Sequence, residues 1–128
     1  MILRYRAWDK IHKTMYEADD IVYINFEENQ ICVKTLFFER ASRYVFDAVV
    51  LMQSTGLRDK NGKEIFEGDI VDSEDGILSG VVEFRPDLGM FVSTLIKYNN
   101  FERLCNVADS VHIIGDIYTN PELAEDHD

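Results

Sequence analysis

The dipeptide Asn61-Gly62 places a tight turn near the middle of this chain. Both residues tolerate positive φ, which a type I′ turn requires at its two central positions, so the pair is a strong short-range signal for a β-hairpin. Leu57 precedes the turn and Ile65-Phe66 follow it, which supplies apolar residues for the two arms. The sequence therefore predicts a β-hairpin with Asn61-Gly62 at its tip and Gly62 at positive φ.

Short runs rich in β-branched and aromatic residues recur along the rest of the chain, separated by turn residues. They span residues 2–8, 21–26, 30–36, 48–53, 77–85, 90–98 and 111–114. Segment 37–44 has weak periodicity and is expected to be irregular or briefly helical. Two short helices are predicted, one within 99–106 capped by Asn100 and one that begins at Pro121 after Asn120. The pattern predicts a mainly β or α+β fold that contains a small barrel.

The length of 128 residues is that of one domain. From Ser54 onward the chain becomes rich in turn residues, and this change in composition divides the domain into parts. We expect a β-rich N-terminal part over residues 1–55, the small barrel over 56–118, and a short helix with an acidic tail over 119–128.

The charge of the chain limits the partners that it can bind. The 24 Asp and Glu residues against 13 Lys and Arg residues give a formal net charge of −11. A field of that sign repels nucleic acids and anionic membrane surfaces, so we expect neither as a partner. No apolar stretch approaches the ~20 residues of a membrane span, and nothing at the N-terminus resembles a signal peptide. These features predict a cytoplasmic protein.

The two cysteines do not form a metal-binding or redox motif. Cys32 and Cys105 each lie among apolar residues and are not in a Cys-x-x-Cys arrangement. Cysteines of this kind are usually small buried hydrophobic residues. We therefore expect both to be reduced and mostly buried.

The spacing of the glycines in residues 56–64 does not fit a phosphate-binding loop or an EF-hand calcium loop. Five residues separate Gly56 from Gly62, where a phosphate-binding loop has four, and Glu64 after Lys63 would repel a phosphate. Gly62 would also occupy the wrong position of an EF-hand loop. An acidic loop could bind calcium weakly, although a solvated loop is the simpler interpretation. Its carboxylates are Asp69, Asp72, Glu74 and Asp75.

The three histidines, His12, His112 and His127, have no zinc-binding spacing. His112 alternates with Val111 and Ile113, which predicts that it lies on the solvent face of a strand. We predict no catalytic, metal-binding or cofactor-binding residue, and a protein that is not an enzyme. A site assembled from groups that are distant in sequence stays open as an alternative.

The N-terminal segment provides the candidate interface residues Arg4, Arg6 and Trp8. They alternate with Leu3, Tyr5 and Ala7, so both faces of this strand carry groups that need partners. Arginine and tryptophan are enriched at protein interfaces, and the acidic C-terminus offers complementary charge. The segment predicts a homo-oligomer, and the alternative is that the same groups fold back and are buried within one chain.

Three stretches together resemble the YopX family, small proteins carried by bacteriophages and prophages. They are residues 4–10 with Met15-Tyr16, residues 51–71 around Asn61-Gly62, and residues 113–123 around Gly115-Asp116. The resemblance implies a phage or prophage origin, a mainly β fold with a small SH3-like barrel in the C-terminal half, and self-association. It implies no activity and transfers no catalytic residue. The two Gly-Asp-Ile steps, at residues 68–70 and 115–117, are interpreted as determinants of the fold.

These observations lead to a functional hypothesis with two alternatives. The chain is expected to be a non-catalytic phage or prophage accessory protein in the cytoplasm of the host bacterium, acting through protein contacts as a homo-oligomer. A host or phage protein is a further possible partner. The alternatives are an acidic inhibitor that occupies a host nucleic-acid-binding protein, and an uncharacterised enzyme.

Overall fold

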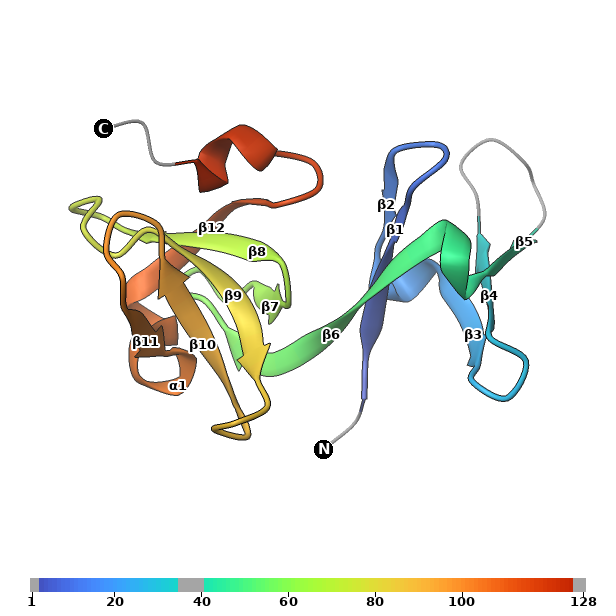
Figure 1. Ribbon diagram of the computed structural model, residues 1–128, viewed down its shortest axis with the longest axis horizontal. Coiled ribbons are helices and arrows are strands. Elements are labelled where there is room, and N and C mark those ends of the chain that lie inside the picture. Colours follow the sequence, from blue (N-terminus) through green and yellow to red (C-terminus); the bar gives the residue numbers. More distant parts are fainter. Residues whose placement is uncertain (1–2, 35–40, 126–128) are drawn as a thin grey trace. The chain divides into compact units, whose positions relative to one another are not determined.

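The computed structural model describes residues 3–34 and 41–125 (Figure 1). The chain divides into two compact units, an N-terminal unit over residues 2–53 and a C-terminal unit over residues 54–128. Each unit has its own hydrophobic core. The fold is mainly β, as the sequence predicts.

The N-terminal unit contains a small sheet and a separate three-stranded sheet. Strand β1 (Tyr5–Asp9) pairs antiparallel with β2 (Thr14–Tyr16) on one side and with the first half of β6 (Val49–Arg58) on the other. The second sheet has the order β3 (Ile21–Asn25), β4 (Gln30–Lys34), β5 (Ala41–Val45), so β3 and β5 are its edges. Two 3-10 turns, Ala18–Asp20 and Phe46–Ala48, precede β3 and β6.

The core of the N-terminal unit draws on both of its sheets. It consists of Ala7, Tyr16, Ile31, Val33 and Val49, all nearly inaccessible to solvent. A fully buried aliphatic side chain contributes about 1.5–3 kcal/mol relative to an exposed one, so these few residues account for much of the stability of a 52-residue unit.

Strand β5 corrects the expectation for residues 37–44. Residues 41–45 form a strand that pairs with β4 over its whole length, with Tyr44 opposite Ile31. Its residues alternate between exposed and half-buried, and Tyr44 packs against the core. The alternation is weak in the sequence because two exposed positions, Ala41 and Val45, are apolar and the half-buried Ser42 is polar. The rest of that segment, and the end of the strand predicted over 30–36, lie outside the described residues.

The C-terminal unit is a curled five-stranded half-barrel together with a hairpin (Figure 1). The sheet order is β11 (Phe101–Arg103), β10 (Met90–Leu95), β9 (Gly80–Arg85), β8 (Asp69–Ser73), β12 (Val111–Asp116), with all neighbours antiparallel. The hairpin joins the second half of β6 to β7 (Glu64–Phe66). A short helix α1 (Leu104–Val107) and a 3-10 turn (Ala108–Ser110) connect β11 to β12.

The core of the C-terminal unit lies on the concave side of this sheet. It consists of Ile65, Val71, Val82, Leu104, Ala108 and Val111, with Phe91 packed against it. Residues from the hairpin, the sheet and α1 therefore share one core.

The Asn61-Gly62 hairpin is confirmed, but its turn is not type I′. Gly62 has φ +83°, whereas among the described non-glycine residues only Lys13 and Asn29 have positive φ. The N–H of Gly62 donates to the carbonyl of Asp59 at 2.9 Å, and the N–H of Asp59 donates to the carbonyl of Lys63 at 2.8 Å. This is a three-residue hairpin loop with one left-handed glycine, in which Asn61 does not need positive φ.

The two predicted helices are shorter or later than expected. The helix expected in 99–106 begins only at Leu104, and Asn100 does not cap it. The Asn100 side chain instead accepts a hydrogen bond from the N–H of Phe101, where β11 begins. The final helix is a single 3-10 turn, Pro121–Ala124, that follows Asn120 as predicted. The Asn120 side chain does not cap this turn and accepts from the N–H of Asp116.

Candidate interaction surfaces and polar clusters

The carboxylate of Asp9 is the centre of a polar cluster in the N-terminal unit. It is fully buried, and its Oδ1 accepts hydrogen bonds from the N–H groups of Ile11 and His12, both at 2.9 Å. Its Oδ2 lies 2.7 Å from His12 Nδ1 and accepts from the Tyr16 hydroxyl at 2.8 Å. The Tyr16 hydroxyl is in turn 3.3 Å from that of Tyr44.

This cluster holds Asp9 in its ionised form. Burial raises the pKa of the Asp9 carboxyl, but the hydrogen bonds from His12, Tyr16 and Ile11 outweigh burial and lower it overall. Burial and the hydrogen bonds to Tyr44 and Asp9 raise the pKa of Tyr16. An ionised carboxylate can only accept, so His12 Nδ1 donates to Asp9 from a half-exposed ring.

The Asp9 cluster was not predicted from the sequence. The available signal was an aspartate that precedes a turn, with a histidine three residues later, which is the spacing of an Asx-type turn. Tyr16 joins this cluster because β2 pairs with β1. Tyr44 joins it because residues 41–45 form β5, which was not predicted as a strand. An oriented imidazole of this kind can accept a proton, but among the described residues no hydroxyl or thiol side chain bonds to the His12 ring.

In the C-terminal unit the Asp59 carboxylate ties the hairpin loop to strand β12. Oδ1 accepts from the N–H groups of Asn61 and Lys63, each at 2.9 Å, and Oδ2 accepts from the N–H of Ile113 at 3.0 Å. The N–H of Lys60 donates to the carbonyl of Val111 at 2.9 Å. Burial raises the pKa of Asp59, and the three backbone donors outweigh it and lower the pKa overall.

The acidic loop proposed for weak calcium binding is dispersed in the structure. Asp69 is buried and accepts from the N–H of Phe66. Glu74 is exposed and pairs with Lys60 at 2.5 Å, while Asp75 accepts from Ser73 and the N–H of Ile77. No three acidic, histidine or cysteine side chains among the described residues converge as metal ligands.

Of the three histidines, His12 lies in the Asp9 cluster and His127 lies outside the described residues. His112 was expected on a solvent face, but it is half-buried and its Nδ1 is inaccessible. In the sheet His112 lies opposite Asp72 of β8, so a neighbouring strand flanks it where the alternation alone predicted solvent.

The candidate interface residues Arg4, Arg6 and Trp8 differ in exposure. The side chain of Arg4 is 44% exposed and lies 3.5 Å from Asp19. Arg6 and Trp8 are only 6% and 9% exposed, and Ala7 and Asp9 beside them are buried too. Both faces of this part of β1 are therefore buried, and of the three only Arg4 presents a large exposed surface. Their role at an interface stays a prediction.

A groove lined mostly by apolar residue types lies beside Arg4 in the same unit. It has a volume of about 340 Å³, and its lining comes from the start of β1 and from the β3 region. Its lining residues are Leu3, Arg4, Tyr5, Ala18, Ile21, Ile24 and Phe26. Leu3 and Phe26 are 59% and 58% exposed, although the ring of Phe26 is held in edge-to-face contacts with those of Tyr5 and Phe46. The groove thus has a rigid aromatic residue at its edge.

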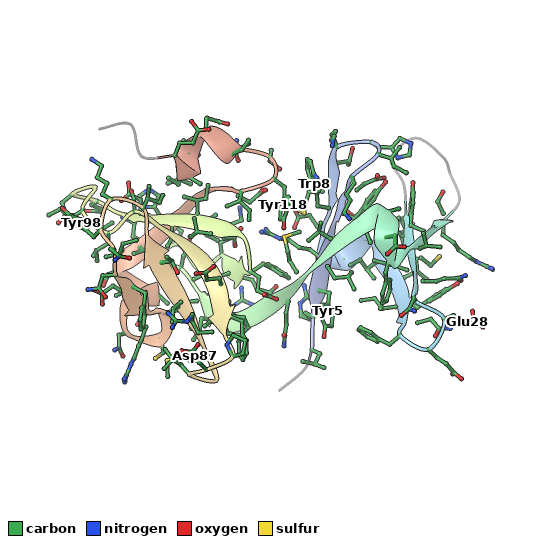
Figure 2. All side chains as sticks on the ribbon, in the orientation of Figure 1. Tyr5, Trp8, Glu28, Asp87, Tyr98 and Tyr118 are labelled. Carbon is green, nitrogen blue, oxygen red and sulfur yellow. The ribbon has the colours of Figure 1, made fainter. Side chains whose placement is uncertain are left out.

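A larger and more polar hollow lies on the C-terminal unit. Its volume is about 610 Å³, and it follows the outer face of β9 and β10 to the β10–β11 loop. The lining residues are Glu83, Arg85, Thr94, Leu95, Ile96, Lys97, Tyr98, Asn99, Asn100 and Phe101. Figure 2 labels Tyr98 in that loop and Asp87 in the turn at the other end of β10.

The two units differ in charge. Residues 2–53 contain seven Lys and Arg and eight Asp and Glu, a formal net charge of −1. Residues 54–128 contain six and sixteen, a net charge of −10. The acidity of the chain is therefore a property of the C-terminal unit.

The family model described as YopX protein matches residues 4–125. The chain belongs to the YopX family. The resemblance seen in the sequence is thus confirmed over nearly the whole chain.

Two solved structures of similar proteins support this assignment. One is the protein EF1440 from Enterococcus faecalis, with 28% identity, a TM-score of 0.69, and coverage of 98% of this chain and 99% of that chain. The other is the protein yopX from Bacillus subtilis, with 27% identity, a TM-score of 0.61, and coverage of 94% and 96%. No curated protein matches the chain. These two structures share the YopX fold with this chain, and neither of them assigns an activity to it.

The YopX fold leaves the two cysteines in different environments. Cys32 in β4 is buried, as predicted, and Cys105 in α1 is exposed, so that half of the prediction is wrong. Helix α1 turns Leu104 into the core, which directs the neighbouring Cys105 outward. Both are free thiols. None of the described helices is long and apolar enough to cross a membrane.

Proposed function

We propose that this YopX-family chain is a non-catalytic phage or prophage accessory protein that acts through protein contacts, as a homo-oligomer formed by its N-terminal unit. The observation that carries the proposal is the groove edged by Leu3 and Phe26. Ordered aromatic residues at the edge of an apolar hollow are the usual anchors of protein interfaces. The phage origin in this proposal is what the family resemblance implies, and the cytoplasm of the host bacterium is the location proposed with it.

The distribution of charge supports a second copy of the chain as the occupant. The N-terminal unit has a net charge of only −1, so two such units meet without strong repulsion, whereas C-terminal units at −10 repel each other. Arg4 and Asp19 lie side by side next to the groove. In a two-fold arrangement, the Arg4 side chain of one copy can reach Asp19 of the other.

The state of the buried carboxylates supports a non-catalytic role. Asp9 and Asp59 accept three or more hydrogen bonds each from groups of their own chain, most of them backbone N–H groups. Such bonds stabilise turns and keep the carboxylates ionised. Asp9 stabilises the N-terminal unit and Asp59 the C-terminal unit, each from within, so neither carboxylate is available to a substrate.

Static light scattering of the full chain tests the proposal. The expected mass is a multiple of 14.9 kDa at micromolar concentration, and Phe26→Asp should shift it toward 14.9 kDa. Ile77→Asp, at an exposed apolar position of the C-terminal unit, is the matched control and should leave the mass unchanged. Circular dichroism checks that each variant folds, and Leu3→Asp repeats the test should Phe26→Asp unfold. A wild-type mass of 14.9 kDa that stays constant with concentration would rule out the oligomer.

The net charge of the C-terminal unit favours a second candidate, an acidic inhibitor of a host nucleic-acid-binding protein. Its exposed carboxylates include Glu74, Asp75, Asp109, Glu122 and Glu125. An array of carboxylates can mimic phosphates, and its binding would weaken steeply with salt. Host proteins eluted by salt from the immobilised chain should then bind duplex DNA, and lose that binding when the free chain is added. Capture of proteins that do not bind DNA would count against this candidate.

A further inference from the structure

The polar hollow of the C-terminal unit is separate from the groove of the proposed interface. One face of the sheet carries the side chains of Glu83, Arg85, Thr94 and Phe101. Thr94 lies directly opposite Phe101, and successive residues along a strand point to opposite faces of a sheet. Val82 and Phe91 lie on that opposite face, in the core. The hollow therefore lies on the outer side of the half-barrel, and its volume of about 610 Å³ is within the range of small-molecule sites, ~300–1,000 Å³.

The loop at one end of the hollow, residues 96–100, has an ordered backbone. The N–H of Leu95 donates to the carbonyl of Asn100 at 3.0 Å, and the N–H of Ile96 donates to that of Ser79 at 3.0 Å. The N–H of Asn100 donates to the carbonyl of Tyr98 at 2.8 Å, and the Asn100 side chain accepts from Phe101. The backbone that carries the side chains of this loop is thus ordered by the fold before any ligand binds.

Three side chains of this loop, those of Lys97, Tyr98 and Asn99, make no hydrogen bond or ring contact with the described residues. Tyr98 is 54% exposed, and among the described residues its ring and hydroxyl have no hydrogen-bond or ring partner. The same holds for the Lys97 ammonium and the Asn99 amide. At the other end of the hollow, Arg85 is held over the ring of Phe101, 4.9 Å from its centroid, by two hydrogen bonds to Asp87. The hollow therefore combines an exposed aromatic ring with fixed donors and acceptors of hydrogen bonds.

The charge around the hollow selects against ionic ligands. The net charge of −10 on the unit repels nucleic acids and other polyanions. Within the lining itself, Arg85 is paired with Asp87 and the charge of Lys97 is balanced by that of Glu83, so the hollow has no local excess charge to bind an ion. A neutral ligand needs no such charge, and amide and guanidinium groups can bond to its hydroxyls as donors or acceptors.

The sheet edge beside the hollow is unsuited to an added peptide strand. The edge strand β11 has only three residues and passes directly into α1. Very short edge strands are one of the ways in which proteins prevent such pairing. A ligand of this hollow is thus bound mainly through side chains.

We propose that the hollow between Arg85 and Tyr98 binds a neutral oligosaccharide. A sugar ring places its C–H face on the ring of Tyr98, which has a negative quadrupole on its face, and its hydroxyls bond to Asn99, Asn100 and Lys97. The hollow extends along β10 from Tyr98 toward Arg85, so it accommodates more than one sugar unit.

Titration of the full chain with maltohexaose and with chitohexaose, followed by amide shifts in NMR, tests the site. At least one hexasaccharide is expected to shift the resonances of residues 96–101, and Tyr98→Ala should weaken its binding about fivefold or more, as loss of a central aromatic contact does. Tyr23→Ala, an exposed tyrosine of the N-terminal unit, is the control and should bind like the wild type.

Three results would overturn the proposal. They are no shift of residues 96–101 with either sugar at millimolar concentration, equal binding by Tyr98→Ala and the wild type, and tighter binding of a thymidine dodecanucleotide or an unstructured peptide at the same residues. Asn99→Ala provides a second test, because its amide is exposed and the substitution does not disturb the core. None of these measurements depends on the oligomeric state of the chain.

Discussion

The carboxylate of Asp59 accepts a hydrogen bond from the backbone N–H of Ile113, 54 residues further along the chain, at 3.0 Å. The same carboxylate closes its own turn through Asn61 and Lys63. One side chain thus shapes the tip of the β6–β7 hairpin and attaches this tip to β12. The hairpin and the half-barrel are held together at this point.

Replacing Asp59 with asparagine should destabilise the C-terminal unit by about 1–3 kcal/mol, because a buried acceptor of three backbone donors is lost in part. Urea unfolding of the full chain, followed by circular dichroism, measures the change. Asp109→Asn, an exposed position near β12, is the control and should change stability by less than about 0.5 kcal/mol. Equal stability of the two variants would contradict the role of Asp59.

The stability of the wild type should also fall in acid through Asp59 and Asp9. Folding lowers the pKa of each carboxyl, so each ionised carboxylate stabilises the folded chain. This stabilisation is fully present at pH values above the ordinary pKa of an aspartate, about 4. This contribution is lost as the pH falls below that value toward the folded-state pKa. Unfolding midpoints between pH 6 and pH 2 should drop more steeply for the wild type than for Asp59→Asn. Parallel curves would show that Asp59 does not have a lowered pKa.

Tyr16→Phe should destabilise the N-terminal unit by about 1 kcal/mol, because Asp9 then loses one of its donors. Tyr23→Phe, an exposed tyrosine of the same unit, is the matched control. An ultraviolet titration provides a second measurement, since Tyr16 should ionise only at a higher pH than the exposed tyrosines. Ionisation of all six tyrosines near pH 10 in the folded wild type would contradict the cluster.

Gly62→Ala should destabilise the hairpin by about 1 kcal/mol, because alanine is strained at φ +83°. A Cβ at this position meets nothing within 4 Å, so the loss comes from the backbone alone. Gly62→Asn should therefore cost less, since asparagine accepts the left-handed conformation. Thermal unfolding of the two variants tests this order, and the reverse order would contradict it.

The thiols should react at different rates. Cys105 is exposed and should be modified by a thiol reagent in the native protein, whereas buried Cys32 should react only after unfolding. Intact mass after brief treatment should show one added group, and peptide mapping should locate it at Cys105. Two added groups in the native state, or a Cys32–Cys105 disulfide, would contradict the structure.

Local chemistry explains the features that the sequence determined by itself. One predicted turn is Asn61-Gly62, and another is Pro86–Gly89 between the predicted strands 77–85 and 90–98. Both depend on residues that favour particular φ values, and those preferences act within four or five residues. The hairpin that each turn predicts is present, with Arg58 opposite Glu64 in the first and Arg85 opposite Met90 in the second. The resemblance to the YopX family rests on such local stretches, so it could be recognised from the sequence alone.

Only the tertiary structure decided which polar groups meet. The contact between Asp59 and Ile113, and that between Tyr16 and Tyr44, join segments that are far apart in the sequence. Their register depends on how the strands pair, which periodicity does not specify. Likewise, alternation along β1 placed groups that need partners on both faces of the strand and left open whether another copy or the same chain covers Arg6 and Trp8. Both are buried within the chain, because burial depends on tertiary packing, which the alternation does not specify.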